Sequence, residues 1–260
     1  MLITLVIRHK RMGKVKELKQ LARSALKGRY WEAVLAYAIL CLPSLIEIVQ
    51  KIYFTVALII ERGFGFYLYT TTVVNTPKVI NILSFLYLLW TVTFLLGYNS
   101  YNLKLIKNEP ASVTNLFDYT KFYIETIWLG LNIFWKAFLW SIGSWVTLFL
   151  ISWGFHITPY ITLLGLIIPL IMMLPYLLSN YVIVENPYLS VQELFQESAR
   201  LMEGNKWNFI LLLLSFIGWF ILGYLTFGLV NILVAPYLSA SLAAFYLDTK
   251  ESHPITTILE

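Results

Sequence analysis

The sequence predicts an all-α polytopic membrane protein, and three features of the chain support this fold class. Hydrophobic residues make up 59% of the 260 residues, charged residues only 13%, and the mean hydropathy is +0.72. A soluble domain would contain about a quarter charged residues, so the apolar excess requires contact with lipid. Apolar runs of about 20 residues recur along the chain, which is the length of a transmembrane helix. The alternating pattern of membrane-spanning strands is missing from these runs.

The apolar runs divide the chain into a basic arm (1–30), a six-helix transmembrane domain (31–248) and a polar cytoplasmic tail (249–260). Six spans place both termini on one side of the membrane. Lys and Arg are concentrated in the arm and in the loops 100–127 and 185–206 on that side, so the positive-inside rule predicts cytoplasmic termini in the cell membrane. The spans are expected at about residues 31–60, 79–99, 128–153, 160–184, 207–222 and 229–248.

The N-terminal arm contains nine of the 19 Lys and Arg residues and accounts for most of the net charge of +5. Residues 14–27 read as a basic amphipathic helix, with Val15, Leu18 and Ala22 on its apolar side. Such a helix is expected to lie on membrane lipids of the anionic cytoplasmic leaflet. A basic run is also typical of nucleic-acid binding, but this one joins directly to a membrane span, so we expect no nucleic-acid partner.

The longest polar interval between two apolar runs, residues 185–207, predicts an interfacial amphipathic helix over 190–203. Ser190 and Glu193 have the spacing of a capping box. Phe195 falls on the apolar face and Arg200 on the polar face, and Trp207 begins the next span at the depth preferred by indole rings. This helix is mainly acidic, so we expect it to dock on a protein partner or near the basic arm of the same chain.

A short sequence similarity indicates a repeat. PASVTNLF from Pro110 matches PYLSVQELF from Pro187, and each precedes an expected interfacial helix (108–127 in the first case, capped by Ser112) and a Trp-led span. The arm supplies a weaker third copy. The chain can therefore be read as three units, each an interfacial helix followed by a transmembrane hairpin. Alternatively, similar caps and Trp anchors arise wherever a chain enters the membrane from the cytoplasm.

Ionisable and polar residues within spans are candidates for function, because they are costly in lipid. Glu47 and Lys51, one turn apart, are one pair, and the alternative is an ion pair at the outer surface. Lys136 is the second candidate, although its long side chain can extend to the interface. Asn231 is the third, although polar side chains also join helices.

Prolines suggest a further kind of site. Pro169, Pro175 and Pro236 interrupt spans four and six and free backbone carbonyls at membrane depth, as broken helices do in transporters. The simpler interpretation is a structural bend, since proline is common in membrane helices. Next to Pro236, Ala235, Ser239 and Ala243 form a stripe of small residues, which predicts a close packing seam within the bundle or between two copies of the chain.

Motifs for catalysis or metal binding are not found in the sequence. His9, His156 and His253 have no ligand spacing between them, and Cys41 has no second cysteine to pair with. Nucleophile elbows, zinc-protease motifs and phosphate loops are missing as well. The sequence therefore predicts a protein that is not an enzyme, with no catalytic residues, no metal and no cofactor.

Five segments carry a resemblance to a known family. They are LKQLARSALKGRYW (18–31), ENPYLS (185–190), SARLMEGNKW (198–207), LSFIGWFILGYLTFG (214–228) and APYLSASLAAFY (235–246). With these segments the chain resembles the bacterial membrane family known as domain-of-unknown-function family 975, and it is more loosely similar to the membrane domain of some glycerophosphodiester phosphodiesterases. The resemblance implies a six-span protein of mostly Gram-positive bacteria and supplies no catalytic residues.

These observations favour a non-enzymatic integral membrane protein that acts through protein partners or lipids at the cytoplasmic membrane. Envelope maintenance and immunity to membrane-active peptides would both suit such a protein. The alternative is a small transporter, or an accessory subunit of an exporter, with a midplane site at the proline-broken spans four and six.

Overall fold

The computed structural model describes residues 2–42, 56, 60, 78–155, 168–226 and 228–252, and every regular element within these ranges is a helix. The predicted all-α class is thereby confirmed. The elements are α1 (Leu2–Leu26), α2 (Tyr30–Leu40), α5 (Lys78–Ile106), α6 (Tyr123–Phe155), α8 (Ser179–Glu185), α9 (Val191–Met202), α10 (Lys206–Leu214), α11 (Ile217–Leu225) and α12 (Leu229–Ser252), with 3₁₀ turns η1 (Val113–Phe117), η2 (Thr120–Phe122) and η3 (Leu174–Tyr176).

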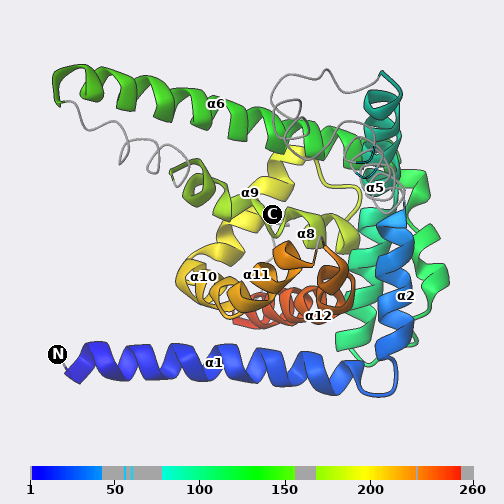
Figure 1. The fold of residues 1–260 in the computed structure, drawn as a ribbon. Coiled ribbons are helices and arrows are strands. Elements are labelled where there is room, and N and C mark those ends of the chain that lie inside the picture. Colours follow the sequence, from blue (N-terminus) through cyan, green and yellow to red (C-terminus); the bar gives the residue numbers. More distant parts are fainter. Residues whose placement is uncertain are drawn as a thin grey trace.

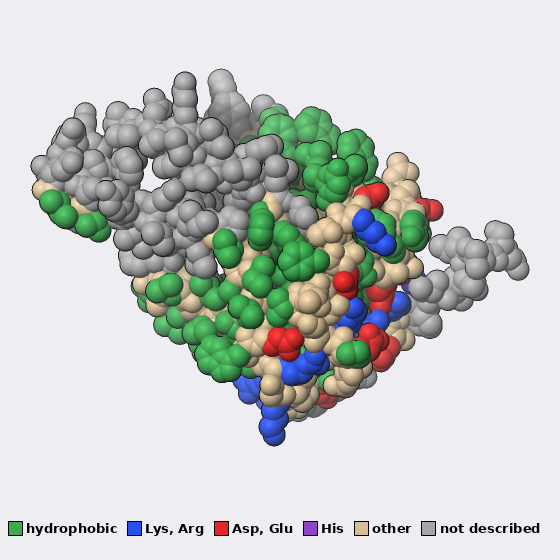
Figure 2. All heavy atoms as spheres, turned by 90° about the vertical axis from the view of Figure 1, so that its right-hand side faces the viewer, with side chains coloured by type: hydrophobic (Ala, Val, Ile, Leu, Met, Phe, Trp, Pro, Cys, Tyr) green, Lys and Arg blue, Asp and Glu red, His purple; other side chains and the backbone are tan. Residues whose placement is uncertain are grey.

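The helices form a bundle between two long outer helices (Figure 1). α1 lies along one side and α6 along the opposite side, while α2 and α5 pack side by side at one end. On the face shown in Figure 2, charged side chains gather towards the lower right, and apolar side chains cover much of the remaining surface that belongs to described residues. This separation of charged and apolar surface is expected of a protein that is partly embedded in a membrane.

Two helical segments in the described part of the chain are long and apolar enough to cross a membrane, Ile168–Glu185 and Leu229–Ser252. A third candidate is the pair α10 and α11, whose axes differ by 41° across a short break. These segments correspond to the predicted spans four, six and five. α5 and α6 coincide with the predicted spans two and three, and α2 covers the start of span one.

The break between α10 and α11 corrects the expectation of one continuous span over 207–222. The Ser215 hydroxyl donates to the carbonyl oxygen of Leu212 (2.6 Å), and the Ser215 N–H lies 3.0 and 3.2 Å from the carbonyls of Leu211 and Leu212. Serine hydroxyls that bond back to the preceding turn compete with the helical ladder and bend helices. Ser215 and Phe216 therefore separate two shorter helices.

The expected interfacial helix over 108–127 is also wrong in its form. Ser112 does cap the segment, as predicted, but the segment folds into η1 and η2, and α6 starts at Tyr123. The Asn115 side chain accepts from the Ser112 N–H (2.9 Å) and donates to Asp118 Oδ2 (2.7 Å). These local side-chain bonds favour a tight turn over a continuing α-helix.

The helix predicted over 190–203, in contrast, forms as α9. Ser190 accepts from the Glu193 N–H while the Glu193 carboxylate accepts from the Ser190 N–H (2.7 Å), which completes the capping box. Phe195 and Ser198 are buried on the predicted apolar face. Gly204 adopts a φ of +74°, the left-handed conformation that ends helices.

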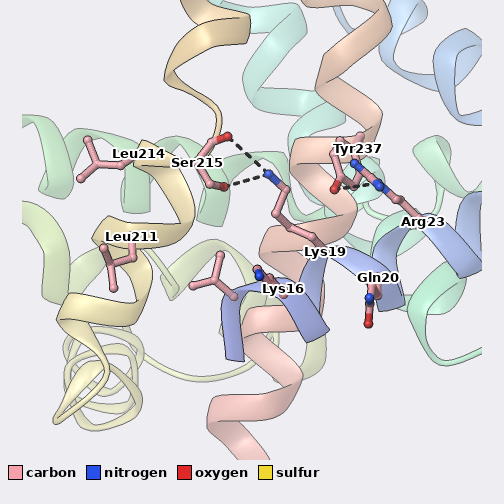
Figure 3. A pocket seen from close by; sticks show the side chains of 9 residues that line it. Lys16, Lys19, Gln20, Arg23, Leu211, Leu214, Ser215 and Tyr237 are labelled. Carbon is pink, nitrogen blue, oxygen red and sulfur yellow. Dashed lines mark hydrogen bonds between the residues drawn. The ribbon is translucent and has the colours of Figure 1, made fainter. Parts of the chain in front are cut away.

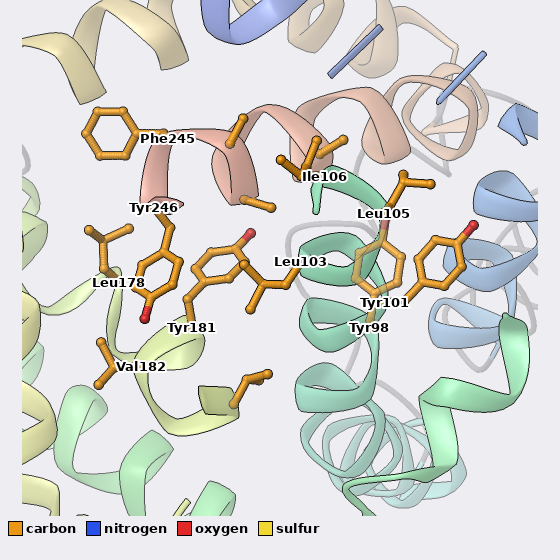
Figure 4. Packing of buried hydrophobic residues seen from close by; sticks show 14 of the residues in the cluster. Tyr98, Tyr101, Leu103, Leu105, Ile106, Leu178, Tyr181, Val182, Phe245 and Tyr246 are labelled. Carbon is orange, nitrogen blue, oxygen red and sulfur yellow. The ribbon is translucent and has the colours of Figure 1, made fainter. Parts of the chain in front are cut away.

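The core of the molecule lies where α5, α8 and α12 meet (Figure 4). The rings of Tyr181 and Tyr246 stack there, with their centroids 5.4 Å apart. At the adjoining face of α5, a Cβ on Gly97 would lie 2.1 Å from the Leu116 carbonyl oxygen, so glycine allows η1 to pack directly on this helix. Residues with fully buried side chains include Tyr101, Leu105, Leu178, Ile183, Phe245 and Tyr246.

The basic arm packs on the bundle through the apolar side predicted from its sequence, since Val15, Leu18 and Ala22 are buried. Its neighbours are α12, α10 and α5. The expectation that the arm lies near the acidic helix is wrong: α9 packs on η3, α8, α12 and α6, and α10 and α12 stand between it and α1 (Figure 1). An acidic group that does pair with the arm is Asp248 of α12, 2.6 Å from Lys14 Nζ.

Candidate functional site: a cationic pocket beside the basic arm

A hollow of about 520 Å³ lies between α1, the break between α10 and α11, and α12 (Figure 3). We call it the cationic pocket. Among the residues that the structure describes, three basic residues line it, together with polar and apolar side chains, and no acidic residue does. Its lining residues are Val15, Lys16, Lys19, Gln20, Arg23, Leu211, Leu214, Ser215 and Tyr237.

The helical repeat of α1 places the basic residues in this pocket. Lys16, Lys19 and Arg23 are separated by three and four residues, so their side chains leave the same face of the helix. This face adjoins the buried apolar face that begins at Val15 and Leu18. Packing of the apolar face against α10 and α12 therefore orients the cations towards the break between α10 and α11.

Lys19 is held by the broken helix. Its Nζ donates to the Ser215 hydroxyl (3.0 Å) and carbonyl oxygen (3.3 Å), and it lies 4.3 Å from the centroid of the Phe216 ring. In a regular helix the N–H of Trp219 would bond to the Ser215 carbonyl, but here it bonds to the Phe216 carbonyl. Lys19 supplies a donor to the Ser215 carbonyl in its place. Burial, together with the nearby charge of Arg23, lowers the pKa of the Lys19 ammonium from its usual 10.5.

Arg23 and Lys16 complete the positive charge of the pocket. Arg23 Nε donates to the Tyr237 hydroxyl (3.1 Å), and its guanidinium lies 5.3 Å from the centre of the Tyr237 ring. Lys16 is exposed and makes no ion pair or hydrogen bond within the described ranges. Arg23 and Lys16 therefore retain donors that point into the pocket region without a carboxylate opposite them.

A second hollow, of about 480 Å³, lies on another side of α1 and has a different charge balance. We call it the compensated hollow. Its basic residues Lys14 and Lys107 are accompanied by the acidic residues Glu17, Asp248 and Glu251. Lys14 pairs with Asp248, so charge on this side of the arm is already satisfied by the chain itself.

Next to the compensated hollow, Glu185 joins three helices. Its carboxylate accepts from Lys107 Nζ (2.8 Å), from the Tyr246 hydroxyl (2.7 Å) and from Lys250 Nζ. Only 14% of the Glu185 side chain is exposed. Lys107 follows α5, Glu185 ends α8, and Tyr246 and Lys250 lie on α12, so this cluster ties the ends of three core helices together.

The structure brings several of the sequence-predicted residues together at a separate contact. Lys136 Nζ of α6 lies 4.9 Å from the Tyr176 ring centroid and 5.0 Å from that of Phe195. The carbonyl of Pro175 accepts from the Ser198 hydroxyl (2.6 Å). Lys136, Pro175 and Phe195 therefore join α6, η3 and α9, and cation–π contact and helix packing account for them.

The other predicted residues lie apart from this contact and from the cationic pocket. Arg200 pairs with Glu197 (2.7 Å) on α9, and Trp207 is exposed at the start of α10. The side chain of Asn231 lies against Gly223 in the adjoining helix. Pro169 and Pro236 are buried. Glu47 and Lys51 lie outside the described residues.

The small-residue stripe of α12 is used inside the bundle. Ala243 is buried, and Ser239, which is half-buried, accepts through its carbonyl oxygen from the Tyr181 hydroxyl (3.5 Å). Just before Pro236, the Leu233 carbonyl accepts from the Tyr30 hydroxyl of α2 (2.7 Å). The predicted seam therefore packs α12 against its neighbours in the same chain.

Sequence reasoning identified the arm but missed the pocket. The spacing of Lys16, Lys19 and Arg23 was available as a signal, because it places the three cations on one face. Their partners, Ser215 and Tyr237, lie about 200 residues later in an apolar stretch and give no signal of their own. Within the described ranges, no group of three or more His, Cys, Asp or Glu side chains is placed to hold a metal ion.

Comparison with known protein families assigns the chain to a family. A family model described as "Protein of unknown function (DUF975)" matches residues 12–253. The chain belongs to this family. The matched region contains every residue that lines the cationic pocket of this DUF975 protein. Comparisons with curated proteins and with solved structures gave no match.

Proposed function

We propose that this DUF975 protein is a non-enzymatic, multi-pass membrane protein that acts by binding anionic lipid at the cytoplasmic leaflet through its basic arm. The observation that carries the proposal is the cationic face of α1, on which Lys16, Lys19 and Arg23 have no acidic residue among the residues that line their pocket. Cations near an anionic membrane surface contribute about 1 kcal/mol each to binding. Envelope maintenance and immunity to membrane-active peptides are cellular roles that suit such binding.

The proposed topology has six spans, with both termini in the cytoplasm, and the three-unit repeat remains part of this proposal. The candidate spans Ile168–Glu185 and Leu229–Ser252 support the membrane location. The density of Lys and Arg in the arm supports its cytoplasmic side. Labelling with a membrane-impermeant maleimide tests the topology. In a Cys41→Ser background, Glu17→Cys and Ser252→Cys, both near the cytoplasmic end of span six, should react only from the cytoplasmic side.

Thermal unfolding in nanodiscs of defined composition tests the proposed function. The full chain should unfold at a higher temperature in phosphatidylcholine discs containing phosphatidylglycerol than in phosphatidylcholine alone. A gain of 1 kcal/mol corresponds to about 2–4 °C for a chain of this size. High salt should reduce the difference, because the charges are near the surface. Equal melting temperatures in the two lipids would contradict the proposal.

Transport is a second candidate, and the 41° break between α10 and α11 favours it. Broken membrane helices leave backbone groups available for substrates at the site of transport. Under this alternative the Ser215 carbonyl, which accepts from Lys19, belongs to a substrate pathway. Flux of a labelled solute across proteoliposomes, reduced by Lys19→Met, would support transport.

A further inference from the structure

The cationic pocket combines two chemistries along its length. Lys16 and Arg23 offer cationic donors at the α1 side, whereas Leu211 and Leu214 of α10 form an apolar wall on the other side (Figure 3). Leu214 is 51% exposed although it belongs to an apolar helix. A ligand that satisfies both sides has an anionic group joined to an alkyl chain.

The position of the pocket along α10 favours a lipid over a free anion. Ser215 lies nine residues after Lys206, or about 13 Å along the helix axis from the start of α10. Because α10 begins at the cytoplasmic side in the proposed topology and Lys14 pairs with Asp248 at the cytoplasmic end of span six, the Lys16 end of the pocket lies near headgroup depth and the Ser215 end lies within the acyl-chain region. A free anion in water has no apolar part to contact Leu211 and Leu214.

Lys19 sets the shape of the pocket and leaves the binding charge to its neighbours. Its ammonium is already held by Ser215 and faces the rings of Phe216 and Tyr237. Arg23 uses Nε for Tyr237, which leaves the two terminal nitrogens of its guanidinium for a phosphate, and a planar guanidinium suits phosphate geometry. Lys16 stands two turns away on the same face and supplies a second charge.

We infer that the cationic pocket binds one anionic phospholipid, with its phosphate held by Arg23 and Lys16 and an acyl chain along Leu211 and Leu214. This inference rests on the proposed function and adds a defined site to it. A diffuse attraction between the arm and the leaflet depends only on total charge, whereas a site depends on which lysine is changed. The two ideas therefore predict different results for two lysines of the basic arm.

Lys27 provides the matched control for Lys16. Lys16 is exposed on α1 and Lys27 is exposed in the turn directly after its end, and Lys27 does not line the cationic pocket. Lys16→Gln and Lys27→Gln remove the same charge from the same arm, so diffuse attraction falls equally in both. Arg23→Lys, which keeps the charge and loses the guanidinium plane, tests the geometry of phosphate binding.

The experiment measures phospholipid retained per chain by native mass spectrometry, after release of the full-length protein from phosphatidylcholine discs containing phosphatidylglycerol. Wild type and Lys27→Gln should retain one phosphatidylglycerol. Lys16→Gln and Arg23→Gln should bind it about five- to tenfold more weakly, and Arg23→Lys should show a smaller loss. Melting temperatures without anionic lipid should be similar in all variants, which shows that each is folded.

Equal loss in Lys16→Gln and Lys27→Gln would overturn the pocket while leaving the proposed attraction of the arm intact. Retention unchanged in Lys16→Gln and Arg23→Gln would also overturn it. An excess of soluble glycerol 1-phosphate should leave the retained lipid in place. Displacement of the lipid would overturn the inference and show that the pocket binds a free phosphate instead. The proposed function is tested separately, by thermal unfolding. If discs containing phosphatidylglycerol gave no stabilisation, that result would contradict the proposed function itself.

Discussion

The two sides of α1 carry similar positive charge but face different surroundings. In the described part of the chain, the cationic pocket is lined by three basic residues and no acidic one, whereas the compensated hollow is lined by two basic residues and three acidic ones. Lys14, on the compensated side, pairs with Asp248 of α12. On the other side, Lys19 and Arg23 contact neutral groups, the aromatic rings and the hydroxyls of Ser215 and Tyr237.

This difference separates two uses of charge in one helix. A cation paired with a carboxylate of its own chain fixes the position of the arm, and little net charge remains for a ligand. A cation held by neutral groups keeps its charge, so the electrostatic potential of the site stays positive. The arm can therefore be attached to the bundle by one side and bind an external anion with the other.

The largest expected effect lies on the compensated side. Glu185→Gln leaves Lys107 and Lys250 without their shared carboxylate, and the Glu185 side chain is mostly buried, although each lysine is about a third exposed. We expect a loss of about 2–3 kcal/mol of unfolding free energy, measured by denaturation in detergent, with lipid retention unchanged. Glu251→Gln, an exposed carboxylate of the same hollow, should change stability by less than about 0.5 kcal/mol. Equal effects of the two substitutions would show that the Glu185 cluster does not hold the helices.

A second prediction concerns a substitution that should make the compensated hollow resemble the cationic pocket. Asp248→Asn removes the partner of Lys14, so the compensated hollow gains positive charge. The stability cost should be about 1 kcal/mol or less, because the pair is partly exposed. Native mass spectrometry should then detect an additional phosphatidylglycerol per chain. Asp118→Asn, which breaks the pair with Lys104 away from α1, serves as the control and should retain only one lipid.

The local parts of this architecture could be predicted from the sequence. Ser190, Glu193 and Gly204 define the two ends of α9 through bonds and backbone conformations within a few residues. The apolar side of α1 follows from periodicity for the same reason. The break at Ser215 could not be predicted, because LLLLSFIGWF reads as uninterrupted apolar sequence and the donor to the Ser215 carbonyl is Lys19, 196 residues away.

The cationic pocket could not be predicted from the sequence either, because it also depends on contacts between distant parts of the chain. A basic amphipathic helix predicts contact with an anionic surface, but the choice between lipid and Asp248 as the neighbour of each lysine depends on tertiary packing. Lys136 shows the same limit. The sequence suggests only that its side chain can extend towards the interface, whereas the rings that it contacts, Tyr176 and Phe195, come from two other elements.

A third prediction concerns Lys19, which shapes the pocket. Lys19→Met keeps most of the aliphatic packing but loses the bonds to Ser215, and it also relieves the repulsion by Arg23. These effects oppose each other, so unfolding free energy should change by less than about 1 kcal/mol. Phosphatidylglycerol retention should fall, because the wall formed by the break is no longer held. Unchanged retention would show that Lys16 and Arg23 form the site without it.

The smallest expected effect is a pH dependence of stability, which arises because Lys19 lies in a pocket of positive charge. The pKa of Lys19 is lowered in the folded chain, so between that value and the unfolded value of 10.5 the unfolded chain binds more protons. Stability of the wild type relative to Lys19→Met should therefore rise as pH increases towards 10.5. Bound phosphatidylglycerol brings a negative charge near the ammonium and should reduce this rise. Thermal unfolding of both chains across this pH range, with and without anionic lipid, distinguishes an occupied pocket from an empty one, and an identical rise in both lipids would place the lipid away from Lys19.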